Sequence, residues 1–391
     1  MSVQHVPLNE FILIRTLPSL HHSKHDGVNR SSKRVSRFIK HARLTVEGLF
    51  AADRAGMLTQ HITAIRVLDD THYVAGGCPC LEHSCALVDR VTLEVKRAVV
   101  RTTDTTHNML CFGSVIVNAS SFGTLTLNDI NSDLRYEIKE YEMSKSSGGA
   151  LIKFNCGRHM AMDTSMAYIL TSKVGTLDDA LIRFDLKDTD IYNLHKSLSK
   201  LKITAVYEGK PARGFCLSHK YAYVLNDFGI TRYCKKTLKK KHFSIENLSE
   251  GKDIHQIAAN DYQVYACSGK QVLLLSLRTP TLQVLDRSQA IAIDSEYYRS
   301  IQSHAVDGLH FAAVMYEHQF GVALFVGYGG KLSLACEYRG DDIGRPLSLM
   351  FDDQNYRLIV GKEDCKSLTF TKKTFTITFT STFTYRKCYR F

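Results

Sequence analysis

Residues 62–95, ITAIRVLDDTHYVAGGCPCLEHSCALVDRVTLEV, contain the pattern that decides the fold. An apolar run over residues 62–67 leads to the polar pair Asp69-Asp70, and a second apolar run over residues 72–77 follows. A third run ends at Asp89 and a fourth begins near Leu93. Short apolar runs separated by polar turns are typical of antiparallel strands. This stretch therefore predicts a unit of four strands.

The same unit recurs along the chain up to about residue 370. Its first turn is followed each time by a strand rich in Tyr, Val, Ala or Leu. The turns come about 47 residues apart, within the roughly 40–50 residues that one propeller blade occupies, and no long helical pattern lies between them. They fall near Asp70, Gly113, Asp163, His219, Asp261, Asp307 and Asp353, and the longer intervals on either side of Asp163 predict insertions.

The third runs of three units end in Asp, at Val88-Asp89, Asn128-Asp129 and Phe184-Asp185. In this respect the units resemble divergent WD-repeat propeller blades. The chain departs from that family in having no Trp and no opening Gly-His pair. The resemblance implies an all-β, seven-bladed propeller of four-stranded antiparallel blades over residues 59–391, with exposed faces that bind proteins. Radial stacking buries the faces of each blade against its neighbours.

The two ends of the chain carry further strand patterns that are suited to closing a ring. Residues 1–20 include Phe11–Leu17, which predicts an N-terminal strand that completes the last blade. Residues 374–385 alternate between Thr and mainly aromatic side chains, which is the period of a strand. Left unpaired, this strand would promote aggregation, so we expect it to pair within the last blade.

Residues 21–58 form a basic segment in which an amphipathic helix is predicted. Ser31 or Ser32 is suited to cap it. Apolar residues recur at helical spacing, at Val35, Phe38, Ile39, Ala42, Val46, Leu49 and Phe50. Basic residues lie largely off that stripe, at Lys33, Arg34, Arg37, Lys40 and Arg43. The helix docks either on the ring or on a partner.

A second basic cluster follows residue 234, at Lys235, Lys236, Lys239, Lys240 and Lys241. The net charge of the chain is +11. Positive charge concentrated in short stretches favours an acidic partner, such as RNA or an acidic protein surface. The simpler interpretation is that these lysines are solvated loop residues that aid solubility.

Two weaker patterns suggest other sites. Cys78, Cys80, His83 and Cys85 are the residue types that bind zinc, although Cys-x-Cys is tighter than the usual zinc knuckle, so free thiols are the alternative. Arg339 lies in Tyr338-Arg339-Gly340, which faintly resembles the Phe-Arg-Arg-Gly motif of phosphoinositide-binding propellers with one arginine missing. That resemblance implies recruitment to membranes as an alternative function.

No catalytic motif stands out, so we expect no enzymatic activity, no cofactor and no small-molecule substrate. The sequence contains no uninterrupted run of about 18 apolar residues, so it predicts no membrane span. The N-terminus lacks a signal peptide pattern. Eleven cysteines without a disulfide framework favour the cytoplasm or nucleus. The sequence therefore predicts an intracellular scaffold that mediates protein–protein interactions within a larger assembly.

Overall fold

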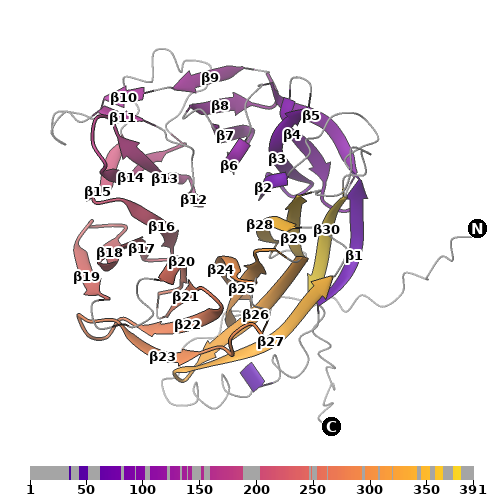
Figure 1. The fold of residues 1–391 in the computed structure, drawn as a ribbon. Coiled ribbons are helices and arrows are strands. Elements are labelled where there is room, and N and C mark those ends of the chain that lie inside the picture. The colour runs from indigo at the N-terminus through magenta and orange to yellow at the C-terminus, as the bar shows by residue number, and fades with distance from the viewer. Residues whose placement is uncertain are drawn as a thin grey trace, which may run out of the picture.

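The protein is a ring of seven antiparallel sheets around a common axis (Figure 1). The computed structural model describes residues 35–36, 44–51, 62–80, 83–92, 94–101, 106–120, 124–132, 134–138, 140–142, 151–153, 159–187, 203–245, 248, 253–261, 263–292, 296–306, 309–318, 320–340, 345–352, 357–363 and 373–379. The predicted seven-bladed propeller is confirmed.

The first three blades follow one another along the chain, each with its first strand innermost. Blade 1 comprises β2 (Ile62–Val67), β3 (His72–Cys80), β4 (His83–Asp89) and β5 (Val95–Arg101). Blade 2 comprises β6 (Thr106–Phe112), β7 (Val115–Ser120), β8 (Leu125–Asp129) and β9 (Arg135–Ile138). Blade 3 comprises β12 (Met160–Asp163), β13 (Met166–Lys173), β14 (Asp179–Asp185) and β15 (Thr204–Gly209).

The remaining blades complete the ring, and the last one combines strands from both ends of the chain. Blade 4 comprises β16 (Ala212–Leu217), β17 (Tyr221–Asn226), β18 (Gly229–Cys234) and β19 (Lys240–Ser244). Blade 5 comprises β20 (Ile254–Ala259), β21 (Val264–Ser268), β22 (Gln271–Ser276) and β23 (Gln283–Arg287). Blade 6 comprises β24 (Tyr298–Val306), β25 (Leu309–Tyr316), β26 (Phe320–Tyr328) and β27 (Lys331–Gly340). Blade 7 comprises β28 (Arg345–Asp352), β29 (Arg357–Glu363), β30 (Lys373–Phe379) and β1 (Leu44–Ala51).

The predicted turns fall where the strands require them. Each of the seven positions lies between the first and second strands of a blade or at the end of the first, as Asp163 does. One insertion accounts for the long interval before Asp163. It carries β10 (Glu140–Glu142) and β11 (Leu151–Lys153), which extend the sheet of blade 3 by pairing β11 with β13.

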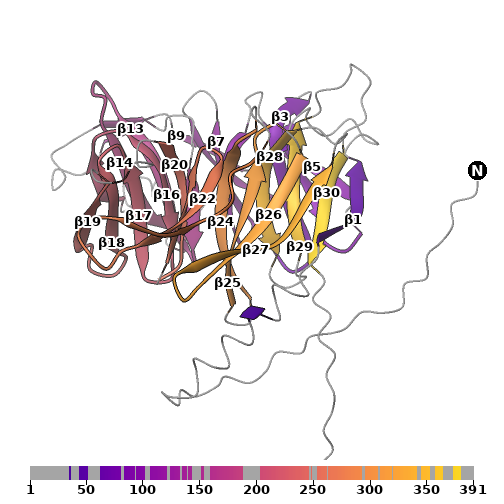
Figure 2. The same ribbon diagram turned by 60° about the horizontal axis from the view of Figure 1, so that its bottom comes forward.

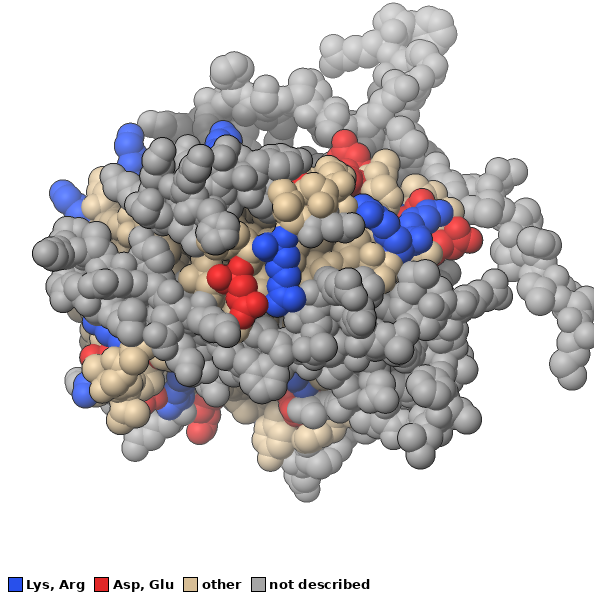
Figure 3. All heavy atoms as spheres, turned by 90° about the horizontal axis from the view of Figure 1, so that it is seen from above, with Lys and Arg blue, Asp and Glu red and all other residues tan. Residues whose placement is uncertain are grey.

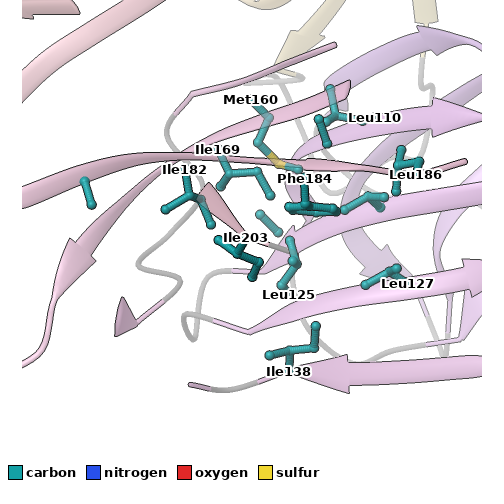
Figure 4. Close-up of a cluster of buried hydrophobic side chains, with 14 residues drawn as sticks. Leu110, Leu125, Leu127, Ile138, Met160, Ile169, Ile182, Phe184, Leu186 and Ile203 are labelled. Carbon is teal, nitrogen blue, oxygen red and sulfur yellow. The ribbon is translucent and has the colours of Figure 1, made fainter. Parts of the chain in front are cut away.

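The hydrophobic core lies between neighbouring blades. Between blades 2 and 3, for example, Leu110 and Leu125 pack with Ile169, Ile182 and Phe184 (Figure 4). All five are at most 2% exposed. A recurring tyrosine near the start of the second strand is also buried in four blades, at Tyr73, Tyr168, Tyr223 and Tyr265. Because this core forms only between stacked sheets, no blade can bury its faces alone.

The three aspartates that carried the WD-repeat resemblance all end third strands. Asp89 Oδ1 accepts hydrogen bonds from the backbone amides of Val91 and Thr92, both at 2.9 Å. Asp129 accepts hydrogen bonds from the Asn131 amide at 3.4 Å and from the Ser132 hydroxyl, and Asp185 accepts one from the Lys187 amide at 3.0 Å. Each carboxylate thus fixes the turn that follows the third strand.

Strand β1 closes the ring by pairing antiparallel with β30, from Leu44 opposite Phe379 to Ala51 opposite Lys373. The C-terminal strand is therefore paired within the last blade, as predicted, although the described strand ends at Phe379. The predicted N-terminal strand within residues 1–20 lies outside the described residues, and the outer position of blade 7 belongs to β1.

The predicted helix is wrong over Leu44–Ala51, which includes Val46, Leu49 and Phe50. This stretch also carries strand formers such as Thr45 and Val46, and the open edge of β30 offers a full row of backbone hydrogen bonds. Tertiary pairing therefore overrides the helical spacing. Of the predicted helix, Val35 and Ser36 are described and are helical.

A buried ion pair reinforces the closure between blades 1 and 7. Arg90 donates to Asp352 Oδ1 over 2.6 Å, and the two side chains are 1% and 0% exposed. Tyr73 donates to the other carboxylate oxygen, and Arg90 also donates to the carbonyl of Asp69 at 2.7 Å. These contacts join residues far apart in the sequence at the seam where the ring closes.

The ring has two distinct faces. Because neighbouring strands in a blade are antiparallel, the first-to-second and third-to-fourth turns share one end of the ring, which we call the lower face. The second-to-third turns and the blade-to-blade connections lie at the other end, the upper face (Figure 2). Val35 packs against the hydrophobic cluster of blades 6 and 7.

Candidate functional site

The second basic cluster lies on the hairpin that joins β18 to β19, at the outer edge of blade 4. Its turn is closed by hydrogen bonds from the Leu238 amide to the Cys234 carbonyl at 2.8 Å and from the Cys234 amide to the Lys239 carbonyl at 3.0 Å. Leu238 takes a positive φ of 55°. Four lysines of this hairpin are exposed, namely Lys236, Lys239, Lys240 and Lys241. We call these four residues the lysine hairpin.

Lys235 does not belong to this exposed set. Its side chain is 9% exposed, and its ammonium group lies 2.5 Å from Asp163 Oδ2. Its carbonyl accepts a hydrogen bond from Arg183. The prediction that Lys235 offers positive charge to a partner is therefore disfavoured, because the residue instead joins blade 4 to blade 3.

Aromatic rings lie beside the positive charges of β18 and β19. The guanidinium carbon of Arg232 lies 4.3 Å from the centroid of the Tyr221 ring, and the ammonium of Lys241 lies 5.0 Å from that of Phe243. Such contacts restrict where these long side chains point. Lysines on an edge strand also prevent pairing with another sheet, which is their simpler structural role.

The charge distribution elsewhere on the ring is mixed. On the side shown in Figure 3, described basic and acidic side chains lie interspersed. Arg135 pairs with Glu137 at 3.2 Å, and Lys96 lies near Asp89 and Glu94 at 3.6 and 3.3 Å. The first predicted contact set, Lys33, Arg34, Arg37, Lys40 and Arg43, lies outside the described residues.

The cysteine cluster occupies the β3–β4 hairpin, in which Cys80 pairs with His83. Cys78 and Cys80 belong to β3, and His83 and Cys85 belong to β4. The side chains of the first three lie outside the described set. Cys85 is fully buried, and burial raises the pKa of its thiol to about 11. In the described part of the chain, no three His, Cys, Asp or Glu side chains converge to hold a metal.

Arg339 is already held by two neighbours. It donates to Glu337 and, over 3.1 Å, to the hydroxyl of Tyr316, whose ring lies 4.5 Å from the guanidinium carbon. A phosphate would have to compete with the Glu337 carboxylate for this group, which disfavours the lipid hypothesis. None of the helices within the described ranges is long and apolar enough to cross a membrane.

A pocket on the upper face between blades 5 and 6 was not predicted from the sequence. Its lining comes from four separate connections, at Asp253, His255, Gly269, Tyr297, Tyr298, Arg299 and Glu317. No short motif joins these residues, so only the folded ring brings them together. The available signal was the charge of Asp253 and Arg299 beside the first strands of blades 5 and 6, and charge at such positions is too common to be specific.

Comparisons with known proteins agree with the architecture. No protein family matches the chain by sequence, and no curated protein does. A chain in the crystal structure of the mitotic checkpoint complex superposes with a TM-score of 0.58 at 10% identity, covering 95% of this chain and 99% of its own. The WD40 propeller domain of Doa1 gives 0.55 at 8% identity, with 86% and 97% covered.

A third structure, the β-propeller domain of Cps50 (Swd1) from Myceliophteria thermophila, gives a TM-score of 0.53 at 10% identity, covering 85% of this chain and 99% of its own. At these identities the similarity establishes the fold alone. The chain therefore has the fold of WD40 propellers.

Proposed function

We propose that this protein is a non-enzymatic scaffold that mediates protein–protein interactions within a larger intracellular assembly. A rigid ring whose blades stack around an axis offers two faces and a rim to partners, and its fold is that of WD40 propellers. The six cysteines whose side chains the structure describes are free thiols, as expected of a protein in a reducing compartment such as the cytoplasm or nucleus.

We further propose that the lysine hairpin, together with the basic N-terminal residues, contacts an acidic partner, either RNA or an acidic protein surface. The observation that carries this proposal is the density of exposed charge, with four lysines within six residues. Among the described residues, the ion pair of this cluster with Asp163 is made by Lys235, and the other four lysines are exposed to solvent. In support, Val35 of residues 21–58 packs against the hydrophobic cluster of blades 6 and 7.

The test is a salt titration of binding to two probes, a single-stranded RNA homopolymer and polyglutamate. We expect replacement of Lys236, Lys239, Lys240 and Lys241 by Gln to weaken binding and to reduce the RNA salt slope by up to about 3, at about 0.7 per lost phosphate contact. Serine replacement of Lys33, Arg34, Arg37, Lys40 and Arg43 tests the N-terminal set separately.

A matched control has the same change in net charge without the clustering. It replaces four exposed lysines from separate parts of the ring, Lys96, Lys187, Lys210 and Lys331, by Gln. Equal losses in the two quadruple variants would mean that binding follows net charge alone, and the lysine hairpin would then have no special role. Binding to neither probe would remove the electrostatic part and leave the scaffold proposal standing.

A further inference from the structure

The pocket between blades 5 and 6 lies on the upper face, opposite the lower-face turns. Its volume is about 490 Å³, within the range of sites that hold small ligands or single side chains. Blade 5 contributes Asp253 and His255 beside the start of β20 and Gly269 from the β21–β22 turn. The start of β24 and the β25–β26 turn of blade 6 provide the other side.

Hydrogen bonds across the blade boundary fix the walls of this pocket. The amide of Tyr298 donates to the carbonyl of Gly269 at 3.1 Å, and His255 Nε2 lies 2.7 Å from the Tyr298 carbonyl. A carbonyl only accepts, so this ring nitrogen carries the proton. Blades 5 and 6 are thereby held together at the base of the pocket.

The blade 6 side is anchored by a buried carboxylate. Glu296 is 0% exposed, and its Oε1 accepts hydrogen bonds from the amides of Glu317 and His318 at 2.7 and 2.9 Å. The Glu317 amide lies also 2.8 Å from the Tyr297 carbonyl. The groups that face the opening are therefore set in position before any ligand arrives, which lowers the entropic cost of binding.

The groups at the opening favour a cation. Asp253 and Glu317 contribute two carboxylates, and Arg299 contributes one guanidinium, which lies 3.6 Å from Glu317 Oε1. The lining thus has two carboxylates against one guanidinium, although the whole chain carries a net charge of +11. Asp253 is exposed, and within the described ranges no cationic side chain forms an ion pair with its carboxylate. Tyr297 is 44% exposed and offers an aromatic surface beside it.

We propose that this pocket binds an arginine or lysine side chain of a protein partner. A guanidinium or ammonium group pairs with Asp253, and the apolar stem or the cation itself packs on Tyr297. Glu317 pairs with Arg299, which keeps the guanidinium group of Arg299 away from the positive charge of the partner's side chain. The site lies on the face opposite the lower-face turns, so it does not depend on the lysine hairpin.

The test uses capped single amino acids as probes and follows assigned backbone amide signals by NMR. N-acetyl-arginine amide is expected to shift the signals of Gly269, Tyr297 and Glu317 in a saturable way, whereas the neutral analogue N-acetyl-citrulline amide is not. Asp253→Asn is expected to weaken arginine binding by about fivefold, the effect of one exposed ion pair.

Asp227→Asn is the matched control, because Asp227 is an exposed carboxylate of the β17–β18 turn on the same upper face, outside the pocket. It should leave arginine binding unchanged. The proposal is overturned if arginine produces no saturable shifts, if Asp253→Asn and Asp227→Asn have equal effects, or if N-acetyl-glutamate amide shifts the same signals more strongly than arginine. The last result would assign the pocket to anions through Arg299.

Discussion

At the scale of single residues, one buried ion pair lies where blades 1 and 7 meet and the ring closes. Arg90 and Asp352 are both fully buried and come from blades at opposite ends of the repeat array. Removing one partner of such a pair leaves the other charge buried without compensation. We therefore predict that Arg90→Met lowers the free energy of unfolding by about 3 kcal/mol or more, measured by urea denaturation.

Two further variants distinguish the contribution of this buried pair from that of surface charges. Lys96→Met removes a 41% exposed partner of Asp89 and Glu94 and is expected to cost no more than about 0.5 kcal/mol. The double variant Arg90→Met with Asp352→Leu should be more stable than Arg90→Met alone, because no isolated charge remains. Equal stability of Arg90→Met and Lys96→Met would show that the pair does not support closure.

At this scale, the sequence did not predict which side chains pair with one another. The lysines after residue 234 were recognisable as a basic cluster, but the partner of Lys235 is Asp163, 72 residues away. Arg339 was likewise recognisable as a lone basic residue, whereas its contact with Tyr316 depends on how β25 and β27 lie in one blade. Such pairings are decided by the fold and not by neighbouring residues.

Strands differ in how well the local sequence specifies them. The first two strands of each blade were predictable, because a polar turn separates two apolar runs in every unit. Strand β1 was not, since residues 44–51 fit a helical stripe as well as an edge strand, and only pairing with β30 decides between them. The edge of a sheet supplies hydrogen bonds that a local pattern does not contain.

Strand β1 should therefore be needed for a stable, monomeric ring. Deleting residues 1–51 exposes the edge of β30, which then offers unpaired backbone groups to other chains. We predict a lower thermal midpoint and concentration-dependent association for this truncation, measured by calorimetry and light scattering. Deleting residues 1–34 keeps β1 and is the control. A 1–51 deletion that stays monomeric and as stable as the control would contradict the assignment.

At the scale of the whole molecule, several blades bury a tyrosine, and this couples the stability of the ring to alkaline pH. Burial raises the pKa of Tyr73, Tyr223, Tyr233 and Tyr265 to about 12, from an ordinary value of 10. The neutral phenols favour the folded state, so their contribution is complete below pH 10 and is lost as the pH rises towards 12. We predict that the urea midpoint falls steeply between these values, and a constant midpoint from pH 9 to 11.5 would refute this.

The architecture as a whole was predictable because repetition is visible in the sequence even without Trp or Gly-His pairs. Seven recurring turns gave the number of blades, and the stacking of sheets followed from the need to bury both faces. The functional surfaces were harder to predict from the sequence, because the upper-face pocket combines Asp253 and Glu317 from different blades. A site assembled across blades leaves no contiguous pattern.

Joining the two ends of the chain in one blade is the feature on which the ring depends, and a disulfide test measures it directly. Val46 lies opposite Ile377 in the register of β1 and β30. Cysteines at these two positions are predicted to cross-link on mild oxidation, as identified by peptide mass spectrometry. The pair Val46→Cys with Phe375→Cys, offset by two residues, should not. Absence of the first link, or equal formation of both, would contradict a ring closed by these strands.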